Sequence, residues 1–222
     1  MSAVAGPPLL SRPMDWIAWL RMGRPCPGAV SVREKGTYTF EQGAEMIERL
    51  REAFGDPQTI AAADLGSGAN ETAVGEQVLR IPWRRLVSVE AHLPSVRKLH
   101  ARAAAAGRHD ILHGRIEALF AEFRPGELDL ALLIDVLEHF SRRQALHLLR
   151  RIERFFALGV VVFLPLGRVE QGPLEGNELQ RHRSSWWARD LAGLGYTVDL
   201  YEAFHGQLDP PADAAWAMKR WG

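Results

Sequence analysis

The chain contains four short, predominantly apolar segments. They are Ile60–Ala63, Leu86–Val89, Leu128–Ile134 and Gly159–Leu164. Short apolar runs without regular polar alternation are typical of strands that are buried on both faces of a parallel sheet. The pattern therefore predicts a sheet in which helices cover both sides.

Segments with helical periodicity lie around these strands. The predicted helices are Thr39–Phe54, Glu71–Leu79, Leu93–Ala106, Ser141–Phe156 and Trp186–Leu194, the last with Ser185 as its N-cap. In the first of them Ile47, Leu50 and Phe54 share one face. The alternation of strands and helices predicts a doubly wound α/β fold with a mostly parallel sheet.

Acidic residues stand where three of the predicted strands end. Asp64 follows the first strand and leads into the turn Gly66-Ser67-Gly68, Glu90 ends the second, and Asp135 ends the third. In doubly wound sheets ligands bind beyond the carboxyl ends of the strands, and glycine lets a ligand approach the backbone closely. An acid about 20 residues after such a turn suits hydrogen bonds to ribose hydroxyls.

These segments together resemble the class I S-adenosylmethionine-dependent methyltransferases. D-L-G-S-G at Asp64–Gly68 resembles the first motif of that family, Glu90 its ribose-binding acid, and D-V-L-E-H at Asp135–His139 the strand-four motif of its small-molecule branch. The resemblance covers roughly residues 39–201. It implies a seven-stranded Rossmann-like sheet that ends in an antiparallel hairpin, here Tyr196–Tyr201 with Ala214–Trp221.

The resemblance also implies S-adenosylmethionine as the cofactor. The residues expected to bind it are Asp64, Gly66, Ser67, Gly68, Glu90, Ile116, Asp135 and Val136. One departure concerns adenine: Arg115 stands where the family usually has an acid for the adenine amine. A noncatalytic methyltransferase-like binding module is therefore kept as an alternative.

A nicotinamide-dependent oxidoreductase is the other alternative. Dinucleotide-binding turns have the pattern G-x-G-x-x-G, whose third glycine allows close packing of helix and strand. Here Glu71 stands at the third position. A carboxylate near the start of the helix would repel a pyrophosphate, which disfavours this alternative.

The acceptor side is expected on the long loop after Gly159–Leu164. The loop and its neighbours resemble a subgroup of small bacterial methyltransferases, and Asn177, Gln180 and Trp186 are its candidate substrate-binding residues. An oxygen or nitrogen of a small polar acceptor, a metabolite or saccharide, needs a base near neutral pKa, and His182 and His139 are the candidates. No metal is expected, because Glu138 and His139 are adjacent and lack the H-E-x-x-H spacing.

Composition adds few constraints. The 222 residues include 27 basic and 27 acidic side chains, so zero net charge gives no reason to expect nucleic-acid binding. Cys26 is the only cysteine, no apolar run is long enough to span a membrane, and the N-terminus lacks a signal-peptide pattern. We expect a cytoplasmic monomer or homodimer, with residues 1–38 as an N-terminal extension or lid and 39–222 as the methyltransferase domain.

Overall fold

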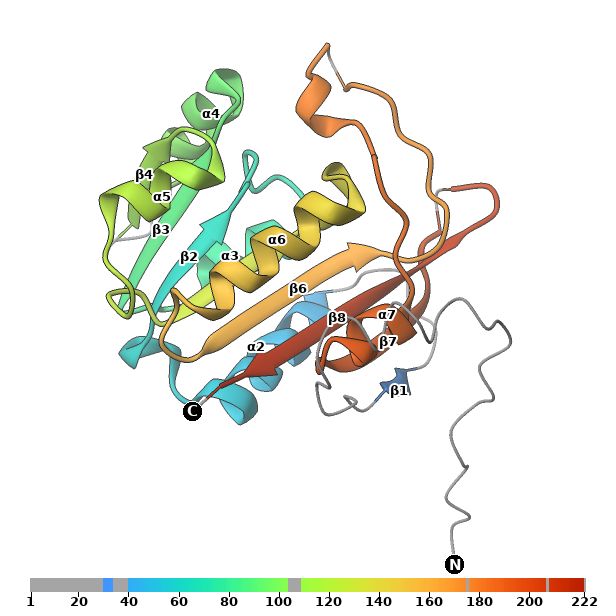
Figure 1. Cartoon of the computed structure of the whole chain (residues 1–222), viewed down its shortest axis with the longest axis horizontal. Helices are drawn as coiled ribbons and strands as arrows, with labels where there is room; N and C mark the ends of the chain where they lie inside the picture. Colours follow the sequence, from blue (N-terminus) through green and yellow to red (C-terminus); the bar gives the residue numbers. More distant parts are fainter. Residues whose placement is uncertain (1–29, 34–39, 104–108, 175, 207, 222) are drawn as a thin grey trace, which may run out of the picture.

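The computed structural model of the chain describes residues 30–33, 40–103, 109–174, 176–206 and 208–221. Its centre is one sheet with the strand order β1-β7-β8-β6-β5-β2-β3-β4 (Figure 1). The strands are β1 (Val30–Arg33), β2 (Ala61–Leu65), β3 (Arg85–Glu90), β4 (His109–His113), β5 (Leu130–Ile134), β6 (Gly159–Pro165), β7 (Thr197–His205) and β8 (Ala212–Arg220). The α-helices are α2 (Phe40–Phe54), α3 (Ala73–Arg80), α4 (Leu93–Ala103), α5 (Ile116–Glu122), α6 (Arg142–Glu153) and α7 (Ala188–Gly193). Short 3₁₀ helices are η1 (Pro57–Thr59), η2 (Leu137–His139) and η3 (Glu178–Gln180).

The strand directions confirm the predicted fold class. Strands β2 to β6 pair in parallel, and only β8 runs antiparallel, to both β6 and β7. The seven strands β2–β8 form the expected mostly parallel sheet with its C-terminal antiparallel hairpin. The short strand β1 adds a parallel edge next to β7, which the apolar pattern did not predict.

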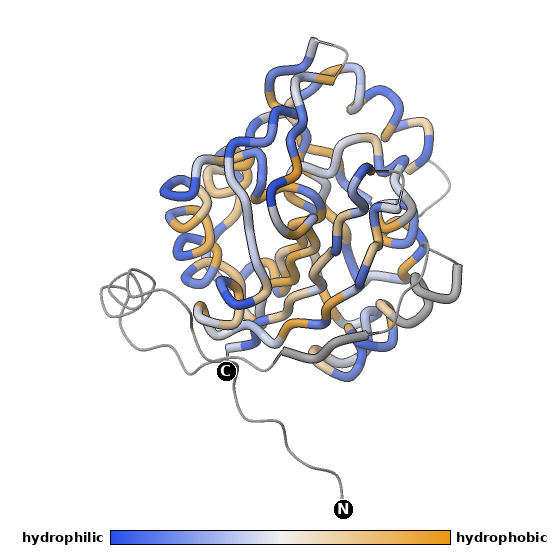
Figure 2. The backbone as a smooth tube through the Cα atoms, turned by 90° about the vertical axis from the view of Figure 1, so that its right-hand side faces the viewer, coloured by the Kyte–Doolittle hydropathy of each residue, from blue (hydrophilic) through white to orange (hydrophobic). Residues whose placement is uncertain are grey.

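Strand β5 explains why the central strands are continuously apolar. Ala131 and Leu133 belong to a core cluster with residues of α5, α6 and α7, whereas Leu130, Leu132 and Ile134 belong to a second cluster with residues of α2 and α3. Successive side chains of a strand point to opposite faces of the sheet, so a strand covered on both faces is apolar at every position. Figure 2 shows these central segments as hydrophobic and the outer turns of the helices as largely hydrophilic.

Helix α6 begins as its sequence predicts. The Ser141 hydroxyl accepts from the Gln144 amide, and the Gln144 side chain accepts from the Ser141 amide, which forms a capping box. This satisfies amide groups that have no partner within the helix. Helix α6 therefore starts within a few residues of η2, at the carboxyl end of β5.

Two predicted helix starts were wrong. The Thr72 hydroxyl caps α3 by accepting from the Gly75 amide, so Glu71 lies before the helix, where it pairs with Lys98 at 3.1 Å. Helix α7 starts at Ala188, two residues later than predicted, with Trp187 and not Ser185 at the N-cap position. The Asp190 side chain accepts from the Trp187 amide and fixes this start. In both cases the side chain that reaches the free amides decided where the helix begins.

Most of the predicted extension, residues 1–38, lies outside the described residues. Its described part is strand β1, which lies in the sheet. The boundary at residue 38 and the cytoplasmic location stay predictions. No helix among the described residues is long and apolar enough to cross a membrane.

Candidate functional site

A glycine turn joins β2 to α3 at the carboxyl edge of the sheet. Gly66 and Gly68 have φ angles of +74° and +59°, in the left-handed region that favours glycine. The Gly66 amide donates to the carbonyl of Val89 at 2.8 Å. A Cβ atom at Gly66 would lie 3.2 Å from Val136 Cγ2, so glycine allows the turn to approach the end of β5 closely.

Glu90, the last residue of β3, holds this turn in place. Its Oε2 accepts from the Gly68 amide at 2.8 Å, and its Oε1 accepts from the His92 amide at 2.6 Å. Each carboxylate oxygen has a second lone pair, so Glu90 can also accept from hydroxyl groups of a ligand. The side chain is buried, but it lines a cavity at the sheet edge.

Two adjoining cavities form the cleft at this edge. The smaller has a volume of about 190 Å³ and is lined by Glu90, Ile116 and Val136, among others. The larger has a volume of about 570 Å³ and extends over the turn to the loop after β6. Gly66 and Asp135 line both cavities, so the cleft is continuous past these two residues.

Asp64 lies behind the turn and lines neither cavity. Its Oδ2 accepts from Asn70 Nδ2 at 3.0 Å, and the side chain is 1% exposed. Burial, with a smaller contribution from Glu90, raises the pKa of Asp64 to about 7 against the opposing effect of the Asn70 hydrogen bond. A Cβ at Gly75 would lie 2.6 Å from Asn70 Oδ1, so this helical glycine lets α3 pack against the turn. Asp64 therefore stabilises the turn from the side of the core.

Asp135 occupies an unusual backbone position at the end of β5. Its φ is +53°, and its amide donates to the carbonyl of Phe163 on β6 at 2.8 Å. A non-glycine residue in this region is strained, and such strain concentrates at functional sites. The Oδ1 atom is buried without a hydrogen-bond partner among the described residues, and burial raises the pKa of Asp135 to about 7.

Glu138, His139 and His182 form a cluster beside Asp135. One ligand atom from each residue lies within 4.8 Å of the others, and the two imidazole centroids are 5.0 Å apart. Burial, together with the nearby His182, lowers the pKa of His139 to about 4. Burial likewise raises the pKa of Glu138 well above its usual range, and Asp135 adds to this shift.

The loop after β6 brings His182 to this cluster. The backbone carbonyl of Glu138 accepts from the amides of Arg183 and Ser184, at 2.7 and 3.1 Å. The Gln171 side chain donates to the carbonyl of Gln180 at 2.7 Å, and the His182 amide donates to the Gln171 carbonyl at 3.0 Å. These hydrogen bonds connect two segments of the loop to each other and connect the loop to the end of β5.

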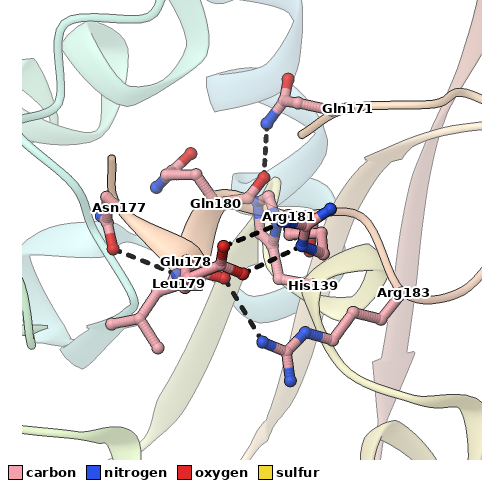
Figure 3. A network of polar contacts seen from close by, with 8 residues as sticks. All are labelled: His139, Gln171, Asn177, Glu178, Leu179, Gln180, Arg181 and Arg183. Carbon is pink, nitrogen blue, oxygen red and sulfur yellow. Dashed lines mark hydrogen bonds and ion pairs between the residues drawn. The ribbon is translucent and has the colours of Figure 1, made fainter. Parts of the chain in front are cut away.

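Ion pairs stiffen the tip of the same loop. Figure 3 shows the Glu178 carboxylate opposite Arg181, whose guanidinium donates to both oxygens at 2.9 Å. The Glu178 carbonyl accepts from Arg183 at 3.4 Å. All three side chains are exposed, so these contacts order the short helix η3 and contribute little to global stability.

Of the three residues predicted to bind the acceptor, two line the larger cavity and one is buried in the core. Asn177 and Gln180 line the larger cavity, although Asn177 Oδ1 also accepts from the Leu179 amide at the start of η3. The prediction that Trp186 binds the substrate was wrong. It is fully buried in the core, its Nε1 donates to Ser184 Oγ at 3.0 Å, and the Arg142 guanidinium lies 3.7 Å from its ring centroid.

With the exception of Asp64, the residues predicted to bind the cofactor lie together at the cleft. Gly66, Ser67, Gly68, Glu90, Ile116, Asp135 and Val136 all line the cleft. Arg115 also lines the smaller cavity, at the N-terminus of α5. Asn70 and Gly75, which support the turn, and His205, which lines the larger cavity, were not predicted. No local motif indicates residues whose roles depend on neighbours that are distant in the chain.

Comparisons with known proteins identify the fold. The sequence matches no protein-family model and no curated protein. Solved structures do match. The CurJ carbon methyltransferase aligns with a TM-score of 0.56 and 13% identity over 78% of this chain and 52% of its own. A complex of the methyltransferase CalH with SAH aligns with a TM-score of 0.52 and 13% identity over 75% of this chain and 52% of its own.

A methyltransferase of more similar length also matches. A SAM-dependent methyltransferase from Aquifex aeolicus aligns with a TM-score of 0.50 and 12% identity, over 82% of this chain and 98% of its own. The chain thus spans about half the length of CurJ and CalH and nearly the whole Aquifex protein. At these identities the likeness concerns the fold, and the chain has the Rossmann-like fold of S-adenosylmethionine-dependent methyltransferases.

Proposed function

We propose that this chain is an S-adenosylmethionine-dependent methyltransferase that acts on an oxygen or nitrogen of a small polar acceptor. The observation that carries the proposal is the cleft where the Gly66–Gly68 turn, Glu90 and Asp135 meet from three adjacent strands. The fold supports this reaction class, and the residues of the cleft are consistent with it.

The smaller cavity suits the nucleoside part of the cofactor. Glu90 offers carboxylate oxygens to ribose hydroxyls, and the apolar side chains of Ile116 and Val136 form a wall for a flat base. The methionine part would then lie along the turn towards Asp135. The positively charged sulfonium and amine favour a cleft that contains carboxylates, because opposite charges attract strongly where water is excluded.

The cleft is less suited to a dinucleotide. Its turn lacks a third glycine, and Glu71, which occupies that position, lines the larger cavity. Glu71 is half exposed and pairs with Lys98, so a negative charge stands near the start of α3. A pyrophosphate would gain less from the positive end of this helix than from a helix start without an acid.

The larger cavity is the proposed acceptor pocket. It contains Asn177 and Gln180 for polar recognition, and His139 and His182 to handle the proton of the acceptor. Methyl transfer needs little covalent help, since in-line positioning of an activated sulfonium does most of the work. Burial lowers the pKa of both histidines, and that of His139 falls to about 4. A base works best with a pKa near the ambient pH, so we assign the base to His182.

Calorimetry tests the cofactor assignment. S-adenosylmethionine and its demethylated product should bind to the purified chain with micromolar affinity, the usual scale for enzyme ligands, and NAD should not. Binding of NAD without binding of S-adenosylmethionine would show that the chain is a dinucleotide-binding protein.

A metabolite screen with S-adenosylmethionine labelled in its methyl group tests the activity. We expect label to appear in a small polar compound. Cofactor binding without transfer to any fraction of a cell extract would favour the noncatalytic alternative over the enzyme.

A further inference from the structure

We propose that Glu138, His139 and His182 form a binding site for a divalent first-row transition-metal ion in the larger cavity. The absence of H-E-x-x-H spacing led to the opposite expectation from the sequence. That spacing brings ligands together on one helix, whereas here the loop after β6 supplies the third ligand from 43 residues beyond His139. The proposal concerns the site of the proposed methyl transfer, but metal binding itself does not depend on that activity.

Distances favour a common ion. Ligand atoms at about 2.1 Å from one metal ion lie within about 4.2 Å of each other. The three ligand atoms here already lie within 4.8 Å of one another, so small side-chain rotations complete the site. The hydrogen bonds of the loop to Glu138 and Gln171 hold the backbone of His182 in this position.

Both histidines are oriented as metal ligands are. His182 Nδ1 lies 2.8 Å from the Val169 carbonyl, and His139 Nδ1 lies 3.3 Å from the Arg181 carbonyl. A carbonyl oxygen only accepts, so each Nδ1 carries the proton and each Nε2 keeps its lone pair. Metal-bound histidines usually donate their other ring nitrogen to a carbonyl or carboxylate in this way, which fixes the tautomer and the ring.

The environment of the Glu138 side chain supports a metal site independently of the distances. Its side chain is 2% exposed, and Oε2 is buried without a hydrogen-bond partner among the described residues. A buried carboxyl oxygen without a partner costs free energy, and a bound cation would remove that cost. The same cation would also compensate Asp135, whose Oδ1 is a further buried atom without a partner in the described part of the chain.

The ligand set indicates the class of ion. Two imidazole nitrogens with one carboxylate suit Zn²⁺, Fe²⁺, Co²⁺ and similar ions, whereas Mg²⁺ and Ca²⁺ prefer oxygen ligands throughout. Three protein ligands leave coordination positions open on the ion. If the proposed function holds, an acceptor hydroxyl could bind there and would lose its proton more readily, so the two histidines would act through the ion.

The test uses the full chain without an affinity tag, because a histidine tag would bind the same ions. The protein is first freed of metal with a chelator and then titrated with Co²⁺, followed by visible absorption, and with Zn²⁺, followed by calorimetry. We expect one equivalent of either ion to bind, release of protons on binding, and no comparable binding of Mg²⁺. No stoichiometric binding of Co²⁺ or Zn²⁺ would overturn the proposal.

Variants locate the ion. Glu138→Gln, His139→Ala and His182→Ala should each weaken binding at least tenfold, since even residues that only orient a ligand contribute that much. His147→Ala is the control, because His147 is exposed on α6 and lies outside the cluster. Binding that survives all three cluster variants, or is lost in the control, contradicts the assignment.

If a variant fails to fold, a measurement on the unaltered chain still tests the metal site. Nitrogen NMR of histidine side chains should show Zn²⁺-dependent shifts of Nε2 in His139 and His182. Unshifted signals in both rings at saturating Zn²⁺ would rule out the site. Neither readout uses S-adenosylmethionine, so failure of this proposal is distinguishable from failure of the proposed function.

Discussion

The two sides of the cleft are built differently. The turn side consists of neighbouring strand ends, where the Gly68 amide bonds to Glu90 and the Gly66 amide bonds to the Val89 carbonyl. The histidine side depends on one long loop after β6, which is tied to the end of β5 through the carbonyl of Glu138. The turn side follows from the strand order of the fold, whereas the histidine side follows from contacts of a single loop.

This difference indicates where specificity resides. Many enzymes share a fold and differ in the loops at the carboxyl edge of the sheet. In this chain the loop contributes Asn177, Gln180 and His182 to the larger cavity, and its tip at η3 is exposed. Substitutions on the turn side should therefore affect stability and cofactor affinity, and substitutions on the loop should affect turnover.

The largest expected effect comes from Gly66→Ala on the turn side. The substitution places a Cβ in the left-handed region and 3.2 Å from Val136, so the free energy of unfolding should fall by about 2–4 kcal/mol. Denaturant titration measures this. Gly172→Ala is the loop-side control, since no atom lies within 4 Å of its Cβ position, and it should change stability by less than about 0.5 kcal/mol. Equal effects of both substitutions would remove the contrast between the two sides.

On the loop, His182→Ala should lower turnover roughly 100-fold or more while cofactor affinity stays nearly intact. The reason is its place in the larger cavity, away from Glu90 and Ile116. Steady-state kinetics with the acceptor found in the screen, together with calorimetry, measures both quantities. His139→Ala is the matched variant, and loss of turnover there alone would reverse the assignment of the base.

Glu90→Ala should weaken cofactor binding by about 1.5–3 kcal/mol, the scale of hydrogen bonds to a charged group. Calorimetry measures the affinity and a thermal melt measures stability. Because Glu90 also accepts from the Gly68 amide, some loss of stability is expected as well. An unchanged affinity with a collapsed melting temperature would mean that Glu90 only supports the turn.

The smallest expected effect is a pH dependence caused by Asp64. The unfolded carboxyl ionises near pH 3.8, while burial keeps the folded one protonated up to about 7. Between these values the folded state holds a proton that the unfolded state has released, so raising the pH lowers stability. From pH 5 to 7 the wild type should lose roughly 1–2.5 kcal/mol more than Asp64→Asn.

Denaturant titrations at several pH values measure this difference. A residual decline is expected in Asp64→Asn, because the pKa values of Asp135 and Glu138 are raised in the same direction. Parallel curves for the two proteins would show that Asp64 is ionised in the folded chain.

Local sequence determined the central strands β2, β3, β5 and β6, most helices and the turn side of the cleft. The apolar run Ile60–Ala63 predicted a buried strand, and β2 forms there at Ala61–Leu65. The glycines that follow it adopt left-handed backbone angles that favour this residue. The position of Glu90 at a strand end then placed it beside the turn, since parallel strands end at the same edge.

Tertiary structure decided what the local pattern leaves open. Trp186 was predicted to bind the substrate, but the chain buries it beneath Arg142, because a large apolar ring gains most free energy in the core. His182 meets Glu138 and His139 only through hydrogen bonds that join distant segments. Short-range periodicity carries no information on such contacts, because their free energy depends on partners that are close in space and far apart in the chain.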